Sequence, residues 1–225
     1  TNLAQLERYG LWEVLFPHTA VAMREDETAL ALITAALSST TQRIMQGKST
    51  TPGFLWAALL WPLAQEKWAE YQTTMQPIPA LDVASSMALD LQFQRVAMPR
   101  RHSSMAREIW QLQPRFTQRR GKRPHSLVQT PRFRAAYDFL LLRAEAEESE
   151  QIVALAQWWT DFIAGDEVAR EALIQTALKD GIAENTGTSS GRKRRRRGGK
   201  KKKAGVASST PDNATEQHTE APGES

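Results

Sequence analysis

Apolar residues recur along this chain at the three- and four-residue spacings of an α-helix, and the period-two alternation of a half-buried strand is scarce. The clearest apolar stripe consists of Met105, Ile109, Leu112 and Phe116, in a segment that opens at Pro99. These side chains fall on one face of a helix and are expected to point to the core. The pattern as a whole predicts an all-α fold with a multi-helix body.

Several further segments show the same spacing and begin or end at residues that favour helix ends. They cover residues 2–9, 26–47, 52–61, 80–93, 131–144, 152–165 and 168–179. The segment behind Thr51 and Pro52 is apolar all round, which is typical of a helix buried at the centre of a domain. An apolar cluster from Leu11 to Phe16 is predicted to end at Pro17.

Buried faces can be assigned to two of these segments from the spacing of their apolar residues. The predicted positions are Leu30, Ile33 and Leu37 in segment 26–47, and Leu81, Ala84, Met87 or Ala88, and Leu91 in segment 80–93. Thr130 and Pro131 are predicted to cap the helix that follows them.

The composition changes after Ala183, where the only large apolar residue that remains is Val206. Nothing there offsets the entropy lost on ordering, so residues 184–225 are predicted to form a disordered, Arg- and Lys-rich tail. The helical part divides by charge into a body region, residues 1–97, and a basic region, residues 98–183.

Charge is segregated along the chain. The stretch from Arg95 to Arg143 holds twelve Lys or Arg residues against only Glu108 and Asp138, a net charge of +10, whereas the whole chain carries +4. The helical segments on either side are net acidic, and the run from Arg192 to Lys203 adds +10. Because the first basic stretch lies among helix-forming apolar residues, it predicts a folded surface that faces a polyanion.

The helix that opens at Pro99 is predicted to carry a ridge of arginines, with Arg119 along one border of it, and Pro114 is expected to kink the helix near Gln113. Cations in the first turn of the helix behind Pro131 oppose its dipole, which indicates a use other than stability. The predicted phosphate-contacting residues are Arg100, Arg101, Arg107, Arg115, Arg119, Arg120, Lys122, Arg123, Arg132 and Arg134, together with Arg192, Lys193, Arg194, Arg195, Arg196 and Arg197 in the tail.

Patterns that carry catalysis or bind metal are scarce. The chain has no cysteine, and its four histidines, His18, His102, His125 and His218, lack metal-ligand spacing. The compact acidic cluster at residues 25–27 could hold Mg²⁺, but acids at the first turn of a helix complement its dipole. No catalytic residue, metal site or cofactor is therefore predicted in this chain.

Aromatic residues offer a second way to bind nucleic acid, because bases stack on exposed rings. The chain has seven tryptophans. Trp159 is expected in the core beside Phe162, which leaves Trp158 or Trp110 as exposed stacking candidates.

Six segments in succession resemble the C-terminal part of bacterial poly(A) polymerases, which share a nucleotidyltransferase superfamily with the tRNA CCA-adding enzymes. The segments are LERYGLWEVLFP, PGFLWAALLW, MPRR, REIWQLQPRF, RRGKRP and PRFRAAYDFLLLRAE. The resemblance covers roughly residues 3–163. It implies an RNA-binding part of an enzyme that adds adenylates from ATP to RNA 3′ ends, with Mg²⁺ and ATP expected only with an N-terminal head that this chain lacks.

On this resemblance, the chain is expected to bind single-stranded RNA 3′ ends and to be inactive alone, and its start at Thr1 is expected to reflect truncation or processing. RNA-decay proteins are candidate partners. Two alternatives stay open, the body of a CCA-adding enzyme and a non-catalytic nucleic-acid-binding scaffold. Without a secretory signal or a membrane-spanning run, a cytoplasmic location is expected, membrane binding is not, and the oligomeric state is left open.

Overall fold

The structure is a computed structural model that describes residues 7–187, with side chains described as far as Lys179. This part of the chain is helical, without strands, so the predicted all-α class is confirmed. The helices are α2 (Leu11–Leu15), α3 (Pro17–Glu25), α4 (Glu27–Met45), α5 (Pro52–Gln72), α6 (Pro77–Phe93), α7 (Arg100–Phe116), α8 (Arg123–Val128), α9 (Phe133–Glu145), α10 (Glu150–Ala164) and α11 (Glu167–Gly187). The tail was predicted to begin at residue 184, but residues 184–187 still belong to α11. The rest of the predicted tail lies outside the described residues.

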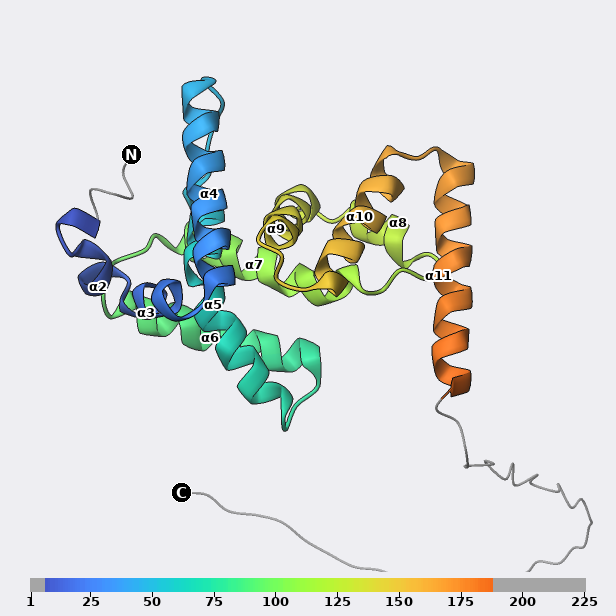
Figure 1. Cartoon of the computed structure of the whole chain (residues 1–225), viewed down its shortest axis with the longest axis horizontal. Coiled ribbons are helices and arrows are strands. Elements are labelled where there is room, and N and C mark those ends of the chain that lie inside the picture. The colour runs from blue at the N-terminus through green and yellow to red at the C-terminus, as the bar shows by residue number, and fades with distance from the viewer. Residues whose placement is uncertain (1–6, 188–225) are drawn as a thin grey trace, which may run out of the picture. The chain divides into compact units, whose positions relative to one another are not determined.

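Helix α5 is the centre of the fold (Figure 1). It packs on α6 and α7 and also contacts α3, α4 and α9. The five consecutive residues from Ala57 to Trp61 are all buried, so the helix is covered on every side. The central helix predicted from the apolar run is confirmed.

Pro62 lies inside α5 and removes one backbone donor from the helix. Carbonyls near this point accept hydrogen bonds from side chains of other helices. Trp110 Nε1 donates to the Ala57 carbonyl at 3.0 Å, and Thr19 Oγ1 donates to the Leu59 carbonyl at 2.7 Å. These bonds fasten α7 and α3 to the central helix.

Helix α7 joins two hydrophobic cores. Met105 and Ile109 belong to a core built with α4, α5, α6 and α9, whereas Leu112 and Phe116 belong to a core built with α8, α9, α10 and α11. The predicted buried stripe is thereby confirmed. Because the first core includes residues before and after residue 97, the division of the helical part at that point stays a prediction about charge.

One predicted detail of the N-terminal half differs from the structure, because Leu30 is exposed at the surface of α4 and not buried. The apolar cluster ends before Pro17, as predicted, since α2 ends at Leu15. Pro17 is the first residue of α3, where its missing N–H is harmless. In α6 the buried face passes through Ala88, one of the two predicted alternatives, and Met87 is exposed.

Among the described helices, none combines the length and the apolar character needed to cross a membrane. Helix α5 is the longest apolar one, and its outer turns carry Glu66 and Glu70, whose hydrogen bonds raise the pKa of Lys67. The polar end of the helix therefore faces water.

Candidate nucleic-acid interface

All ten cations predicted for the helical region lie at the surface. Arg107 and Arg119 are half-buried and the other eight are exposed. They come from α7, from the loop that joins α7 to α8, from the first residue of α8 and from the segment that enters α9. The predicted contacts from Arg192 to Arg197 lie outside the described residues.

Arginines on α7 project away from its buried side. Arg100, Arg107 and Arg115 fall within about 80° of one another around the helix axis, at 100° per residue. The opposite side of the helix carries the buried stripe that ends at Phe116. Residues of α7 therefore supply one row of guanidinium groups.

The helix continues through Pro114 and ends two residues later at Phe116. Gln113 Nε2 donates to the Ile109 carbonyl at 3.1 Å, one residue before the carbonyl that Pro114 leaves without its backbone donor. The prediction that Arg119 lies along a border of this helix was wrong. It lies in the following loop, because the chain leaves the helix once Phe116 has reached the second core.

The loop after α7 turns at Gly121, whose φ of 61° is the left-handed conformation that glycine adopts without strain. The Arg119 guanidinium lies over the Trp158 ring, 5.7 Å from its centroid. Trp158 stacks on Phe162 and is 9% exposed, and Trp110 is fully buried. The prediction that one of these two tryptophans is exposed for base stacking was wrong, since both complete the cores.

Two of the predicted cations have carboxylate partners at the start of α9. Arg132 Nε contacts Glu108 Oε2 at 2.6 Å, and Arg134 Nε contacts Asp138 Oδ1 at 3.0 Å. Arg132, and not Thr130, is the N-cap of α9, because the segment before it forms a turn. Exposed ion pairs of this kind contribute about 0–1 kcal/mol, so a phosphate can compete for the guanidinium.

Arg107 and Arg143 differ in how far they are neutralised. Arg107 Nη1 lies 4.0 Å from Asp82 Oδ1 at the surface of α6, a long contact. Arg143 is 5% exposed and its guanidinium pairs with Glu148. Counting Arg143 toward a basic surface was therefore wrong, because this cation belongs to the interior.

A groove of about 450 Å³ lies between α7 and the turn that precedes α9. Arg115 and Arg132 both line it, together with Glu108, Gln111 and Thr130. Cations that are separate in the sequence thus meet across one depression. The depression offers two guanidinium groups, an amide, a hydroxyl and the Glu108 carboxylate. All but the carboxylate suit phosphate oxygens, and the carboxylate can accept from a sugar hydroxyl.

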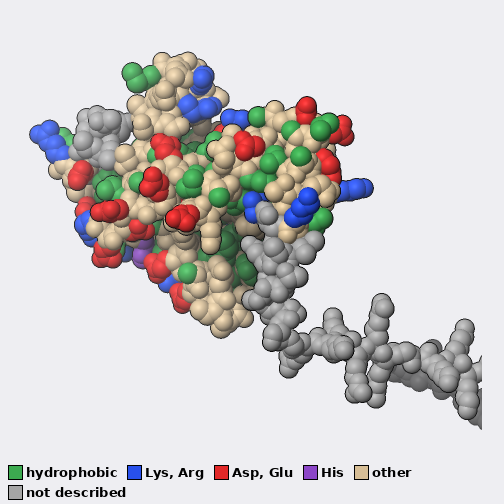
Figure 2. Space-filling model, turned by 45° about the vertical axis from the view of Figure 1, so that its right-hand side comes forward, with side chains coloured by type: hydrophobic (Ala, Val, Ile, Leu, Met, Phe, Trp, Pro, Cys, Tyr) green, Lys and Arg blue, Asp and Glu red, His purple; other side chains and the backbone are tan. Residues whose placement is uncertain are grey.

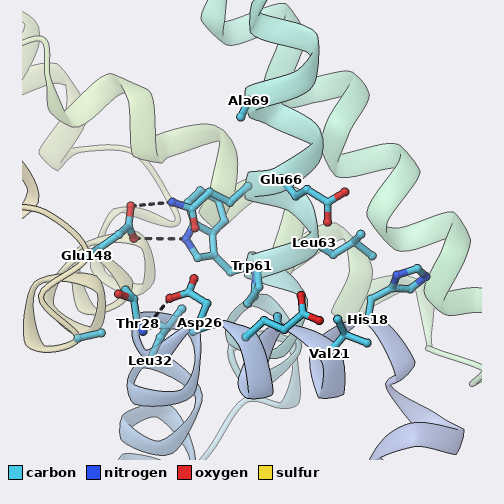
Figure 3. Close-up of a pocket in the computed structure, with 16 residues that line it drawn as sticks. His18, Val21, Asp26, Thr28, Leu32, Trp61, Leu63, Glu66, Ala69 and Glu148 are labelled. Carbon is cyan, nitrogen blue, oxygen red and sulfur yellow. Dashed lines mark hydrogen bonds between the residues drawn. The ribbon is translucent and has the colours of Figure 1, made fainter.

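Helices before α7 carry the opposite charge. Figure 2 shows one face of the molecule, on which Asp and Glu side chains outnumber Lys and Arg over its left half. A groove of about 490 Å³ lies between α3, α4 and α5 and is lined by His18, Asp26, Glu66 and Glu148 (Figure 3). A polyanion is repelled from such a surface and directed toward the cations.

The acidic cluster at residues 25–27 has a structural role. Asp26 is the N-cap of α4 and accepts a hydrogen bond from the Thr28 backbone N–H at 2.8 Å, and Glu27 lies in the first turn. This agrees with the predicted helix start. In the part of the chain that the structure describes, no three His, Asp or Glu side chains lie where they could hold a metal ion.

Comparison with known proteins gives the family. The family described as "Polymerase A arginine-rich C-terminus" matches residues 73–202. Poly(A) polymerase I of Haemophilus influenzae is 37% identical over 174 residues, which cover 76% of this chain and 38% of that protein. Poly(A) polymerase I of Salmonella typhi is 37% identical over 163 residues, 70% of this chain and 35% of that protein.

Poly(A) polymerase I of Escherichia coli O157:H7 is 35% identical over 164 residues, which cover 68% of this chain and 34% of that protein. The chain thus spans little more than a third of the length of these relatives. Neither the CCA-adding enzyme nor the non-catalytic scaffold is favoured by these matches. The basic surface lies within the matched region, and the chain belongs to the poly(A) polymerase family, in which it corresponds to the arginine-rich C-terminal part.

Proposed function

We propose that this chain is the RNA-binding part of a poly(A) polymerase and that its cations grip the backbone of single-stranded RNA 3′ ends. One observation carries the proposal: seven of the ten predicted cations have no carboxylate partner among the described residues. They are Arg100, Arg101, Arg115, Arg119, Arg120, Lys122 and Arg123. They extend along α7 and through the loop behind it, so one RNA strand can meet several of them.

The chemistry of this surface favours contacts to phosphates over contacts to bases. Guanidinium groups bind phosphate oxygens without reading sequence. The tryptophans that could stack on bases are buried or half-buried. We therefore expect weak sequence preference and strong dependence on salt, because each neutralised phosphate releases counterions.

In a protein as long as its relatives, this part would hold the RNA 3′ end while adenylates from ATP are added to it. The relatives bear the name poly(A) polymerase I, which supports that assignment. Association with RNA-decay proteins stays a prediction. The same holds for the tail residues Arg192 to Arg197 as a second contact with RNA.

The test is the affinity of the 225-residue chain for a labelled oligoadenylate, measured between 50 and 200 mM salt. Charge reversal at three positions in and directly after the loop, Arg119→Glu, Arg120→Glu and Arg123→Glu, removes three phosphate contacts. The slope of log affinity against log salt is expected to fall by about 2, at about 0.7 per phosphate of a single strand.

A matched control reverses three exposed cations outside this surface, Arg8→Glu, Arg24→Glu and Lys179→Glu. It changes the net charge by the same amount and should leave most of the slope intact. An affinity that does not change with salt, or an equal loss of affinity in both triple variants, would rule out the proposed surface.

A further inference from the structure

A third groove, of about 560 Å³, lies between the C-terminal half of α4, the start of α5 and α9. Helices α4 and α9 contact each other, and Figure 1 shows the far end of α4 extending beyond that contact. Residues 41–49 are exposed along that extension. The groove is therefore open to solvent along one side of the projecting helix.

Cations line both walls of this groove. Arg43 comes from α4, and Arg132 and Arg134 come from the start of α9. Arg43 is exposed, and its Nη2 donates to the Ser49 carbonyl at 3.2 Å, which holds the side chain beside the turn between α4 and α5. Within the described residues, Arg43 pairs with no carboxylate.

The floor and rim between the cations are rich in hydroxyl groups. Ser39, Thr40, Ser49, Thr50 and Thr51 all line the groove. The Thr40 hydroxyl donates to the Ala36 carbonyl at 2.7 Å. The Thr51 side chain makes no capping hydrogen bond to α5, although Thr51 is its N-cap. Hydroxyls both donate and accept, so they suit ribose 2′-OH groups as well as phosphate oxygens.

Two carboxylates and one aromatic ring also line the groove. Asp138 is engaged by Arg134, and Glu145 lies at the end of α9. Carboxylates repel phosphates but accept hydrogen bonds from ribose hydroxyls and from the exocyclic amine of adenine. Phe54 is half-buried in the same groove, and its open side offers an apolar surface to a base.

This groove meets the one between α7 and α9. Pro131 and Arg132 line both depressions, so the two lie side by side, with Arg115 lining one, Arg43 lining the other and Arg132 between them. Arg43 is separated in sequence from every cation of the basic stretch. It joins them only because α4 lies against α9.

We propose that the groove between α4 and α9 binds the continuation of the RNA strand held by the basic surface, with Arg43 as a further phosphate contact and the Ser and Thr hydroxyls on ribose. This inference rests on the proposed function. The ligand is a single-stranded ribonucleotide segment, with phosphate near Arg43 and Arg132 and with sugar or base near the carboxylates.

The first test is the substitution Arg43→Gln in the whole chain, with oligoadenylate affinity as the readout. Loss of one phosphate contact should weaken binding about fivefold at 0.1 M salt and lower the salt slope by about 0.7. The matched control is Lys48→Gln, which removes an exposed cation five positions away that does not line the groove. Arg43→Lys keeps the charge and should retain the slope.

A second test detects the bound RNA directly and removes no cation from the groove. The chain contains no cysteine, so a single thiol can be introduced by Ser49→Cys in the groove or by Thr74→Cys in the exposed turn between α5 and α6. Saturating oligoadenylate should slow alkylation of the thiol at position 49 several-fold. The thiol at position 74 should react at an unchanged rate.

The outcomes separate this inference from the proposed function. If oligoadenylate binds with a steep salt slope but leaves position 49 unprotected, and Arg43→Gln behaves as Lys48→Gln does, the groove is not part of the RNA path. The basic surface would stand in that case. If the chain does not bind oligoadenylate at all, both proposals fail together.

Discussion

Arg143 shows how one side chain of the basic stretch serves the interior instead of a ligand. Its Nη1 donates to Gln113 Oε1 at 3.0 Å, its Nε donates to Glu148 Oε2 at 2.6 Å, and the guanidinium lies 4.8 Å from the centre of the Trp61 ring. Glu148 also accepts from Gln65 Nε2 at 3.0 Å. The network therefore ties α5, α7 and α9 to the turn that follows α9.

Glu148→Gln should destabilise the fold, because it leaves the Arg143 charge buried without its partner. Removing one member of a buried ion pair costs about 3–5 kcal/mol. Urea unfolding followed by circular dichroism measures the loss as a lower midpoint. Glu147→Gln is the control, since it removes the same charge from an exposed neighbour and should change stability by less than about 0.5 kcal/mol.

Replacing both partners of the ion pair separates the effect of an unpaired buried charge on stability from the effect of the lost hydrogen bonds. In a chain with Arg143→Met and Glu148→Met, no unpaired charge remains in the interior, so stability should lie closer to that of the parent than to that of Glu148→Gln. A double variant as unstable as the single one would mean that hydrogen bonds to Gln113 and Gln65, and not the buried charge, dominate the network.

Some contacts of single residues could not be predicted from the sequence. The basic stretch correctly predicted ten surface cations, but it did not predict which of them pair with carboxylates. Arg132 pairs with Glu108, 24 positions away, and Arg107 lies near Asp82 on another helix. Such pairs depend on how the helices pack, which no local spacing encodes.

At the scale of elements, the sequence predicted those helices that have a clear apolar pattern of their own. Helix α5 was expected from its Thr-Pro start and its continuous apolar run, and α7 from its stripe. Helix α3 was missed because it buries only Thr19 and Ala20. Its anchor is the hydrogen bond from Thr19 to the Leu59 carbonyl of α5, a contact across 40 positions.

Helices α5 and α7 approach closely at Gly53, and this contact predicts a second variant. A Cβ added at Gly53 would lie 2.9 Å from Met105 Cβ and 3.0 Å from its Sδ. Gly53→Val should therefore push the helices apart and destabilise the chain by about 1–3 kcal/mol or more. Thermal unfolding measures this as a lower Tm.

The control for this prediction is a double-mutant cycle. In a Met105→Ala background the Sδ and Cγ contacts are gone, so Gly53→Val should be less harmful there than in the parent chain. Equal losses in both backgrounds would place the strain in the backbone of α5 rather than at the crossing.

For the whole molecule, the sequence predicted a segregation of charge, and the structure maps it onto different surfaces. The acidic groove lies beside α3, and the cation-lined grooves lie beside the start of α9. The segregation of charge could be predicted because the net charge of each segment follows from counting its residues. The role proposed for Arg43 could not be predicted, because Arg43 belongs to the acidic half of the sequence and reaches Arg132 and Arg134 only through the packing of α4 on α9.

We predict that the folded surface and the basic run make separable contributions to RNA binding. Neutralising Arg192 to Arg197 with glutamine removes six cations and should lower the salt slope by up to about 4, at about 0.7 per phosphate. The remaining slope belongs to the folded surface, and adding the charge reversals at Arg119, Arg120 and Arg123 should remove about 2 more. If neutralising the run abolishes oligoadenylate binding on its own, the helical surface is not a binding site, because the seven cations that have no carboxylate partner among the described residues would then attract no phosphate.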